Sequence, residues 1–285
     1  MRKFIFIIIY TIVLLLVGRS LIFLPKIGFI TSPQKETEAV KKDIKKVTDA
    51  APGSYGIYYA SLVDDNSFGI NEKQVFTGGS VNKIPIIAVL YHLADKNKIN
   101  LDEVITLKKE DIQDYGTGSL RYQKPGATYS FKTLTKLSLQ QSDNTAAHII
   151  STKIGTDVVQ KTINDWGLSQ TDMINNKTSP YDMYLLFTKI YKGEVTNEAL
   201  TKELLGFLTD SDFEDRIPIN LPKDVKVYHK TGDTLGGVHD LGIIENKGKA
   251  FYLGVMTTDI GNNENETKQY IGVIAKKIFN LSQEN

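Results

Sequence analysis

The sequence predicts an α/β protein in which an antiparallel sheet is flanked by helices and carries an all-helical subdomain. Segments that favour strands gather near the two ends of the chain, over residues 54–71 and 225–257. Between them, from about Leu101 to Gly193, apolar residues recur mostly at helical spacing. A chain of 285 residues is long enough for one such domain, or for two closely packed subdomains. We assign residues 34–80 and 220–285 to the α/β part and residues from about 81 to 219 to the helical part.

The first 31 residues are predicted to be an export segment with a linker rather than part of the fold. Two basic residues precede Phe4–Val17, which carries no charge. Phe4–Leu24 is long enough to span a membrane if its one arginine reaches the surface, and small residues around Ser20 also permit cleavage. A signal anchor and a cleaved signal peptide both remain open. Either one places the catalytic domain, residues 32–285, outside the cytoplasmic membrane, with membrane attachment if the segment is kept.

The N-terminal part of the domain begins with an amphipathic helix expected over Gln34–Ala50. Ser54–Val63 is predicted to be a strand, followed by a turn and a return strand over Ser67–Asn71. The apolar run Ile84–Leu93 predicts the next helix, with Ser80 at its N-terminus.

The rest of the chain is predicted to be helical first and then to return to strands. Helices are expected over Phe131–Gln140, Asn144–Lys153, Thr156–Trp166 and Tyr181–Tyr191, with Ser130 and Ser179-Pro180 as start signals. Strands are expected over Val225–Lys230, Gly237–Glu245 and Ala250–Thr257, and a last helix over Thr267–Leu281. Residues 262–266 are predicted to be a solvated loop.

Composition excludes several classes of function. The formal net charge of +1 and the lack of a basic stripe argue against a nucleic-acid partner. The chain has no cysteine, which removes thiol nucleophiles and cysteine-ligated zinc. Its four histidines lack metal-ligand spacing, so we expect neither a metal nor another cofactor. Nothing in the sequence indicates an oligomer interface, and we expect a monomer.

The chemistry is centred on Ser80 and Lys83, which follow two glycines and lie three residues apart. Three residues is close to one helical turn, so both side chains share a face. A serine needs a base beside it, and an amine whose pKa is lowered by partial burial supplies one. A second copy of the pattern, Ser32 with Lys35, lacks the glycines, and we interpret it as coincidental.

Two further tripeptides distinguish Ser80 from this second copy. Ser142-Asp143-Asn144 is predicted to lie at a junction of two helices, and Lys230-Thr231-Gly232 to end a strand. A set of Ser-x-x-Lys, Ser-Asp-Asn and Lys-Thr-Gly in this order is known from penicillin-interacting enzymes. The chain therefore resembles the class A β-lactamases and the penicillin-binding D,D-peptidases related to them, over about residues 36–282.

The resemblance implies a role for each motif residue. Ser80 would be the acylated nucleophile, Lys83 its base, and Ser142 the relay that protonates the leaving nitrogen. Asn144 would hold the substrate's side-chain amide. The substrate carboxylate would meet Lys230, Thr231 and Gly232, and the backbone N–H groups of Ser80 and Asp233 would form the oxyanion hole.

Two further substrate-binding residues are expected from the same resemblance. Relatives often add an arginine for the substrate carboxylate, and Arg216 is our candidate, with a plain surface arginine as the alternative. Tyr115 is expected at the rim of the site, where many relatives have an aromatic residue, although exposed tyrosines are common.

The chain departs from the class A pattern in the loop before Thr178-Ser179-Pro180. Class A enzymes carry a glutamate there that activates the deacylating water, but residues 166–177 contain no glutamate. Asp172 is the one carboxylate inside this stretch, and whether it replaces the glutamate is left open. Without such a base, an acyl-enzyme formed with a β-lactam should hydrolyse slowly.

Three functions follow from these observations. The first is a serine hydrolase that is acylated at Ser80 by β-lactams, opens the ring by amide hydrolysis and deacylates slowly. The alternatives are a D,D-carboxypeptidase-like enzyme acting on peptidoglycan peptides and a non-turnover, membrane-tethered binding domain. An α/β-hydrolase esterase is disfavoured, because Ser80 is followed by Asn82 where that motif needs glycine.

Overall fold

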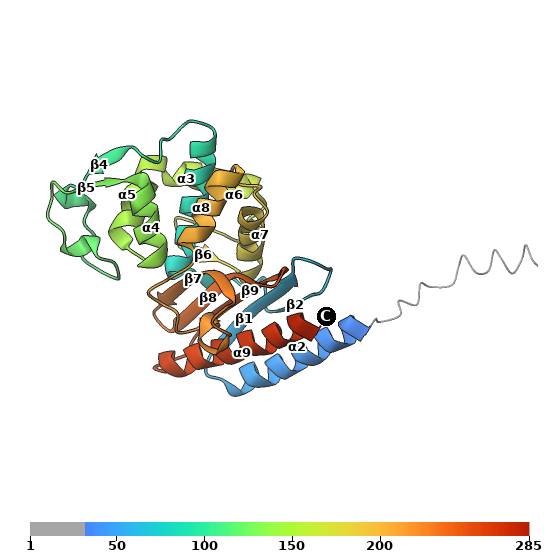
Figure 1. Ribbon diagram of the computed structural model, residues 1–285. Helices are drawn as coiled ribbons and strands as arrows, with labels where there is room; N and C mark the ends of the chain where they lie inside the picture. The colour runs from blue at the N-terminus through green and yellow to red at the C-terminus, as the bar shows by residue number, and fades with distance from the viewer. Residues whose placement is uncertain (1–31, 285) are drawn as a thin grey trace, which may run out of the picture. The chain divides into compact units, whose positions relative to one another are not determined.

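The computed structural model describes residues 32–284, and the fold belongs to one compact unit, Glu36–Asn285 (Figure 1). The expected export segment lies outside the described residues. Among the residues that are described, no helix combines the length and the apolar character needed to cross a bilayer.

A five-stranded antiparallel sheet forms the α/β part, in the spatial order β2-β1-β9-β8-β7. The first and last parts of the chain therefore build one sheet, as the sequence predicts. The strands are β1 (Ser54–Ser61), β2 (Ser67–Ile70), β7 (Lys226–Thr234), β8 (Gly237–Asn246) and β9 (Lys249–Thr258).

Both faces of the sheet pack against a hydrophobic core. Side chains alternate between the two faces along each strand, so one strand contributes to both cores. On β9, Tyr252 and Met256 belong to the core under the helical part, whereas Phe251, Leu253 and Val255 belong to a second core. Helices α2 (Ser32–Ala50) and α9 (Glu264–Glu284) run along that second face (Figure 1).

The helical part lies between β2 and β7 in the sequence and is capped as the sequence predicts. Ser130 accepts a hydrogen bond from the N–H of Thr133, and Ser179 accepts one from the N–H of Asp182, with Pro180 as the first helical residue. Its helices are α3 (Lys83–Asp95), α4 (Phe131–Gln140), α5 (Asn144–Ile154), α6 (Thr156–Asp165), α7 (Pro180–Tyr191) and α8 (Glu198–Phe207).

The helical part also contains strands that the sequence interpretation missed. Two short antiparallel pairs occur there, and periodicity cannot detect strands of two or three residues. One pair joins β4 (Val104–Thr106) to β5 (Thr128–Ser130), and the other joins β3 (Phe76–Thr77) to β6 (Lys177–Thr178). Helix α8 was missed as well.

Three predicted positions and boundaries were wrong. Ser80 lies in a 3₁₀ turn, Gly79–Asn82, and the α-helix begins only at Lys83. Strand β7 continues past Lys230 to Thr234, because β8 pairs with it along its whole length. Helix α9 begins at Glu264, inside the segment predicted to be a loop, and its acidic first turn suits the positive end of the helix dipole.

Candidate active site

Ser80 is placed by the short strand β3 and the 3₁₀ turn that follows it. Gly79 has a φ of +55°, in the left-handed region that glycine adopts without strain. The carbonyl of Thr77 accepts a 2.8 Å hydrogen bond from Nε2 of His239, whose Nδ1 accepts from the N–H of Thr257. Burial lowers the pKa of His239 to about 4, so a neutral, fully buried imidazole anchors the strand that leads to Ser80.

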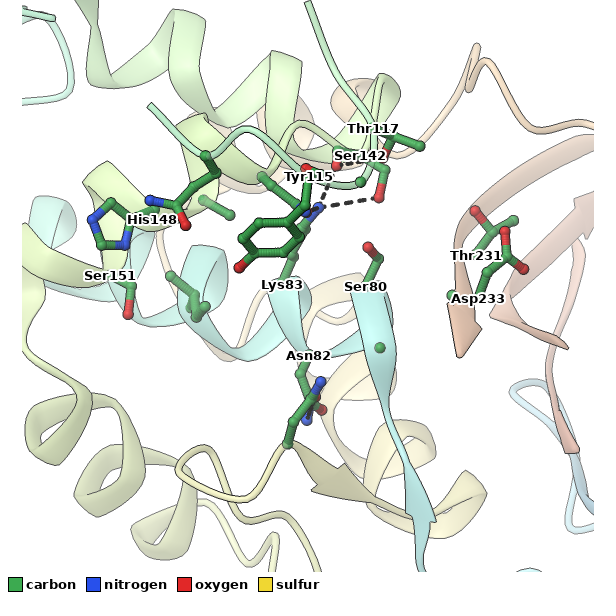
Figure 2. Close-up of a pocket in the computed structure, with 18 of the residues that line it drawn as sticks. Ser80, Asn82, Lys83, Tyr115, Thr117, Ser142, His148, Ser151, Thr231 and Asp233 are labelled. Atoms are coloured by element: carbon green, nitrogen blue, oxygen red, sulfur yellow. Dashed lines mark hydrogen bonds between the residues drawn. The ribbon is translucent and has the colours of Figure 1, made fainter. Parts of the chain in front are cut away.

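A cavity of about 550 Å³ opens beside Ser80. It is lined by all three motifs predicted from the sequence and by residues of the loop 172–177. Figure 2 shows Ser80 between Thr231 and Asp233 on one side and Lys83, Tyr115 and Ser142 on the other. The lining residues include Ser80, Asn82, Lys83, Gln113, Tyr115, Thr117, Ser142, Asn144, His148, Ser151, Met173, Asn176, Phe213, Thr231, Gly232 and Asp233.

The Lys83 amine is buried and is held by the Ser142-Asp143-Asn144 motif. Its Nζ donates to the Ser142 carbonyl and to Oδ1 of Asn144 at 2.7 Å, and it lies 3.2 Å from Oγ of Ser142. Burial, and after it the charge of Lys230, lower the pKa of Lys83 well below its ordinary value, against an opposing effect of Asp143. The neutral amine is therefore favoured, and it is the form that can accept a proton.

The Ser142 hydroxyl lies between two buried amines. Its Oγ is 3.2 Å from Nζ of Lys83 and 3.1 Å from Nζ of Lys230. Burial, followed by the charge of Arg216, lowers the pKa of Lys230 to about 7, against Asp240 and Asp233. A hydroxyl both donates and accepts, so Ser142 can pass a proton along this path. The hydroxyl of Ser80 makes no hydrogen bond to another described residue.

Asn144 and Gly232 shape two sides of the surroundings of Ser80. Asp143 caps α5 through the N–H of Ala146, and the Asn144 amide both accepts from Lys83 and donates to the carbonyl of Tyr115 at 3.1 Å. A Cβ on Gly232 would lie 2.8 Å from the carbonyl oxygen of Gly78, so glycine lets β7 approach the Ser80 turn. Tyr115 lines the cavity with 63% of its surface exposed, as a rim residue would.

Arg216 is fully buried, so the alternative of a plain surface arginine was wrong. Its guanidinium lies 2.7 Å from Oδ1 of Asp233 and 3.2 Å from Oδ1 of Asp215, and it donates to the carbonyl of His239 at 2.8 Å. The cavity is not lined by its side chain. Arg216 therefore supports β7 from behind, and direct contact with a substrate carboxylate stays a prediction.

The Asp172 carboxylate forms hydrogen bonds within its own turn. Its carboxylate accepts from the N–H groups of Ile174 and Asn175 at 2.9 Å and from the Asn175 side chain at 2.7 Å. These bonds lower the pKa of Asp172. The cavity is lined by Met173 and Asn176 of this loop and not by Asp172. The structure thus gives Asp172 a local structural role and does not place it as a base.

Several cavity residues were missed by the sequence interpretation. Asn82 lies inside the Ser-x-x-Lys pattern; its Nδ2 donates to Asn176 at 2.7 Å, while its buried Oδ1 has no hydrogen-bond partner among the described residues. His148 and Ser151 lie four and seven residues after Asn144 on α5. Helical spacing from Asn144 could have found them. Phe213 and Asn176 lie in loops, where no such signal exists.

Comparison with known proteins agrees with this geometry. The family model described as "Beta-lactamase enzyme family" matches residues 39–281. The chain belongs to the β-lactamase enzyme family. The match covers every motif discussed above and nearly all of the described fold.

Individual relatives of this family are distant but align over most of their length. The chain is 23% identical to β-lactamase SME-1 of Serratia marcescens over 234 residues, 75% of this chain and 79% of that protein. It superposes on PBP-A with a TM-score of 0.81 and 26% identity, covering 87% of this chain and 97% of PBP-A. A PBP-A variant solved as an acyl-enzyme complex with penicillin G gives the same TM-score at 25% identity, over the same shares of the two chains.

Family, fold and activity class follow from these matches. The fold is the β-lactamase/transpeptidase-like arrangement, and the protein is a serine hydrolase of the class A β-lactamase-like family. In the described part of the chain, no group of three or more histidine, aspartate or glutamate residues could hold a metal ion.

Proposed function

We propose that the protein forms an acyl-enzyme at Ser80 with β-lactams and opens their ring, and that this acyl-enzyme is hydrolysed slowly. The single observation that carries the proposal is the position of the Ser142 hydroxyl between two buried amines, Lys83 and Lys230, beside the Ser80 cavity. Burial favours the neutral form of Lys83, which a proton acceptor requires, and lowers the pKa of Lys230 to about 7, so Lys230 gains or loses a proton near neutral pH.

Acylation then follows from the positions of these groups. Oγ of Ser80 attacks the lactam carbonyl carbon, its proton passes to Lys83, and the developing oxyanion faces backbone N–H groups of Ser80 and Asp233. Breaking the C–N bond leaves a nitrogen that takes a proton through Ser142. The substrate carboxylate is held by the Lys230, Thr231 and Gly232 segment, and Asn144 and Tyr115 hold the acyl side.

Slow deacylation is supported by the lack of a positioned carboxylate. Asp233 is the one carboxylate lining the cavity within the described residues, and it is ion-paired with Arg216. Water must attack the Ser80 ester to release the opened product, and general-base assistance contributes about 10²–10⁴-fold to such a step. Without that assistance, the ester should persist.

The test is intact-mass spectrometry of the full-length protein in mild detergent, mixed with benzylpenicillin and followed over time. The expected result is an adduct of one penicilloyl group that lasts for many minutes. Ser80→Ala should abolish the adduct. Ser32→Ala is the matched control, because it removes the serine of the other Ser-x-x-Lys pattern, and it should leave labelling intact. An adduct that survives Ser80→Ala would refute the assignment, and one that vanishes within seconds would refute slow deacylation.

A second function, D,D-carboxypeptidase activity on peptidoglycan-like peptides, is favoured by the same lack of a free carboxylate, since such enzymes do not need the loop glutamate. It predicts release of D-alanine from an N-acyl-D-alanyl-D-alanine peptide. Ser80→Ala should stop that release. If the unaltered protein releases no D-alanine, this second function is excluded and the reaction with β-lactams remains as the proposed function.

We also propose that the protein acts outside the cytoplasmic membrane, tethered by the apolar N-terminal segment Phe4–Leu24. The full-length chain should then stay with membranes after an alkaline carbonate wash. A chain lacking residues 4–24 is the control and should be recovered in the soluble fraction. Full-length protein released by the wash would contradict the tether.

A further inference from the structure

The cavity extends well past the reaction centre along one face of α5. The lining residues Asn144, Ala147, His148 and Ser151 recur at steps of three and four, so they lie on one helical face. At 1.5 Å per residue, the seven residues from Asn144 to Ser151 span about 10 Å. The cavity therefore reaches roughly that far along the helix from the residue predicted to hold the substrate amide.

Ser80 lies between two ends of this cavity. Figure 2 shows Thr231 and Asp233 at one end and His148 and Ser151 at the other, with Ser80 between them. If the substrate carboxylate is held at β7 and the scissile carbonyl lies at Ser80, the acyl group must extend toward His148. This orientation rests on the proposed function.

The lining changes in character along that path. Ile86, Ala147 and Met173 are apolar and suit the methylene or aromatic part of an acyl group. Gln113, His148 and Ser151 present an amide, an imidazole and a hydroxyl to the same cavity, each able to donate a hydrogen bond. The lining thus combines apolar side chains with polar ones, and Figure 2 places His148 and Ser151 at the end away from Thr231.

These polar groups are available to a ligand. Neither His148 nor Ser151 makes a side-chain hydrogen bond to another described residue, and Gln113 Nε2 makes only a 3.3 Å bond to the carbonyl of Asp111. Asp233, the one carboxylate among the described lining residues, is at the opposite end and paired with Arg216. An anion at the His148 end would meet donors and no lining carboxylate.

We propose that Gln113, His148 and Ser151 form a subsite for a carboxylate carried at the far end of the substrate's acyl group. The carboxylate could belong to the side chain of a β-lactam or to a peptide ending in D-alanyl-D-alanine. The apolar stretch between Ser80 and the subsite selects a spacer of several methylene groups.

The test uses matched ligands that differ in one terminal group. Adipoyl penicillin ends in a carboxylate, and heptanoyl penicillin has the same length but ends in a methyl group. The same two acyl groups on D-alanyl-D-alanine form the peptide pair. Binding is measured at equilibrium on the full-length Ser80→Ala protein, so the result does not depend on acylation.

We expect about tenfold tighter binding of the adipoyl ligand in at least one pair, because hydrogen bonds to a charged group are stronger than those between neutral groups. Adding His148→Ala and Ser151→Ala should remove this preference while leaving the heptanoyl affinity within about twofold. Thr152→Ala is the matched control, since Thr152 is exposed on α5 and does not line the cavity.

The outcomes separate this inference from the proposed function. A preference in the penicillin pair assigns the carboxylate to β-lactam side chains, and one in the peptide pair assigns it to a peptide. No preference in either pair, or one that survives the double substitution, would overturn the subsite. If the unaltered protein is not acylated by penicillin while the preference is seen, the proposed function fails and the subsite stands.

Discussion

Two walls of the cavity are built from different chemistry. The wall formed by β7 rests on buried basic groups: Lys230, Arg216 and His229 are all almost completely inaccessible to solvent. Burial alone would lower the pKa of His229, but the Asp240 carboxylate at 2.7 Å, with Glu214, raises it to about 9. Each of these basic side chains is held in place by partners from elsewhere in the sequence.

The loop 172–177 is held by an amide pair, by its own backbone and by the Asp172 carboxylate, which bonds within the turn. Asn176 accepts a 2.7 Å hydrogen bond from Asn82, and Asp172 and Lys177 pair through their backbones. Its cavity-facing residues, Met173 and Asn176, carry no charge. The comparison teaches that β7 offers supported basic groups to a substrate carboxylate, whereas the loop offers no base for the second half of the reaction.

The largest expected effect is at Lys83, which faces the β7 wall across Ser80. Lys83→Ala should slow acylation by benzylpenicillin about 10²–10⁴-fold, because it removes the amine that accepts the Ser80 proton. Reversible binding, measured in the Ser80→Ala background with and without the Lys83 change, should weaken much less. Equal losses in rate and affinity would mean that Lys83 is a structural residue.

The support behind β7 is tested by Arg216→Ala. Removing a buried cation that bonds to Asp233 and to the carbonyl of His239 should lower the free energy of unfolding by roughly 3–5 kcal/mol. For a domain of this size the melting temperature should fall by roughly 10 °C. Arg121→Ala is the control, because Arg121 lies in the short 3₁₀ turn Leu120–Tyr122 and is only partly buried. A stable Arg216→Ala protein would show that the wall does not depend on this ion pair.

The buried histidines predict how stability changes with pH. His229 is protonated in the fold, so its contribution is complete below its unfolded pKa of about 6.5 and is lost as pH rises to about 9; it amounts to about 3 kcal/mol. His239 has the opposite sign: its contribution is present above pH 6.5 and falls away toward pH 4.

Urea unfolding between pH 4 and 9.5 should therefore compare the unaltered protein with His229→Gln, because Lys83 and Lys230, whose lowered pKa values favour stability as pH rises, act in both proteins. The stability advantage of the unaltered protein over His229→Gln should shrink as pH rises from about 6.5 to 9, while the acidic decline caused by His239 remains in both. An advantage that does not change over this range would show that the His229–Asp240 pair does not titrate as described.

The smallest effect is expected in the loop 172–177. Asp172→Asn keeps an oxygen for the N–H groups of Ile174 and Asn175, so both the fold and the lifetime of the acyl-enzyme should be unchanged. The lifetime is measured by the decay of the penicilloyl adduct. A lifetime prolonged tenfold or more would make Asp172 the missing base and remove the contrast between the two walls.

Local signals in the sequence were sufficient for most elements. Ser130 and Ser179 as helix caps, Pro180 as a first helical residue and the alternating strands at both ends all occur where predicted. The family assignment, based on the motifs at Ser80, Ser142 and Lys230, was confirmed. These features depend on neighbours within a few residues, or on short motifs that keep their spacing.

Only the tertiary structure decided which side chains meet. The ion pair of Arg216 with Asp233, the position of Ser142 between Lys83 and Lys230, and the cavity face of α5 each join segments far apart in the chain. The residue types alone do not show that Arg216 is buried behind β7 or that Asp172 bonds within its own turn. Either side chain could have faced the cavity. Burial and partners depend on how the sheet and the helical part pack, and that packing is set by the whole chain.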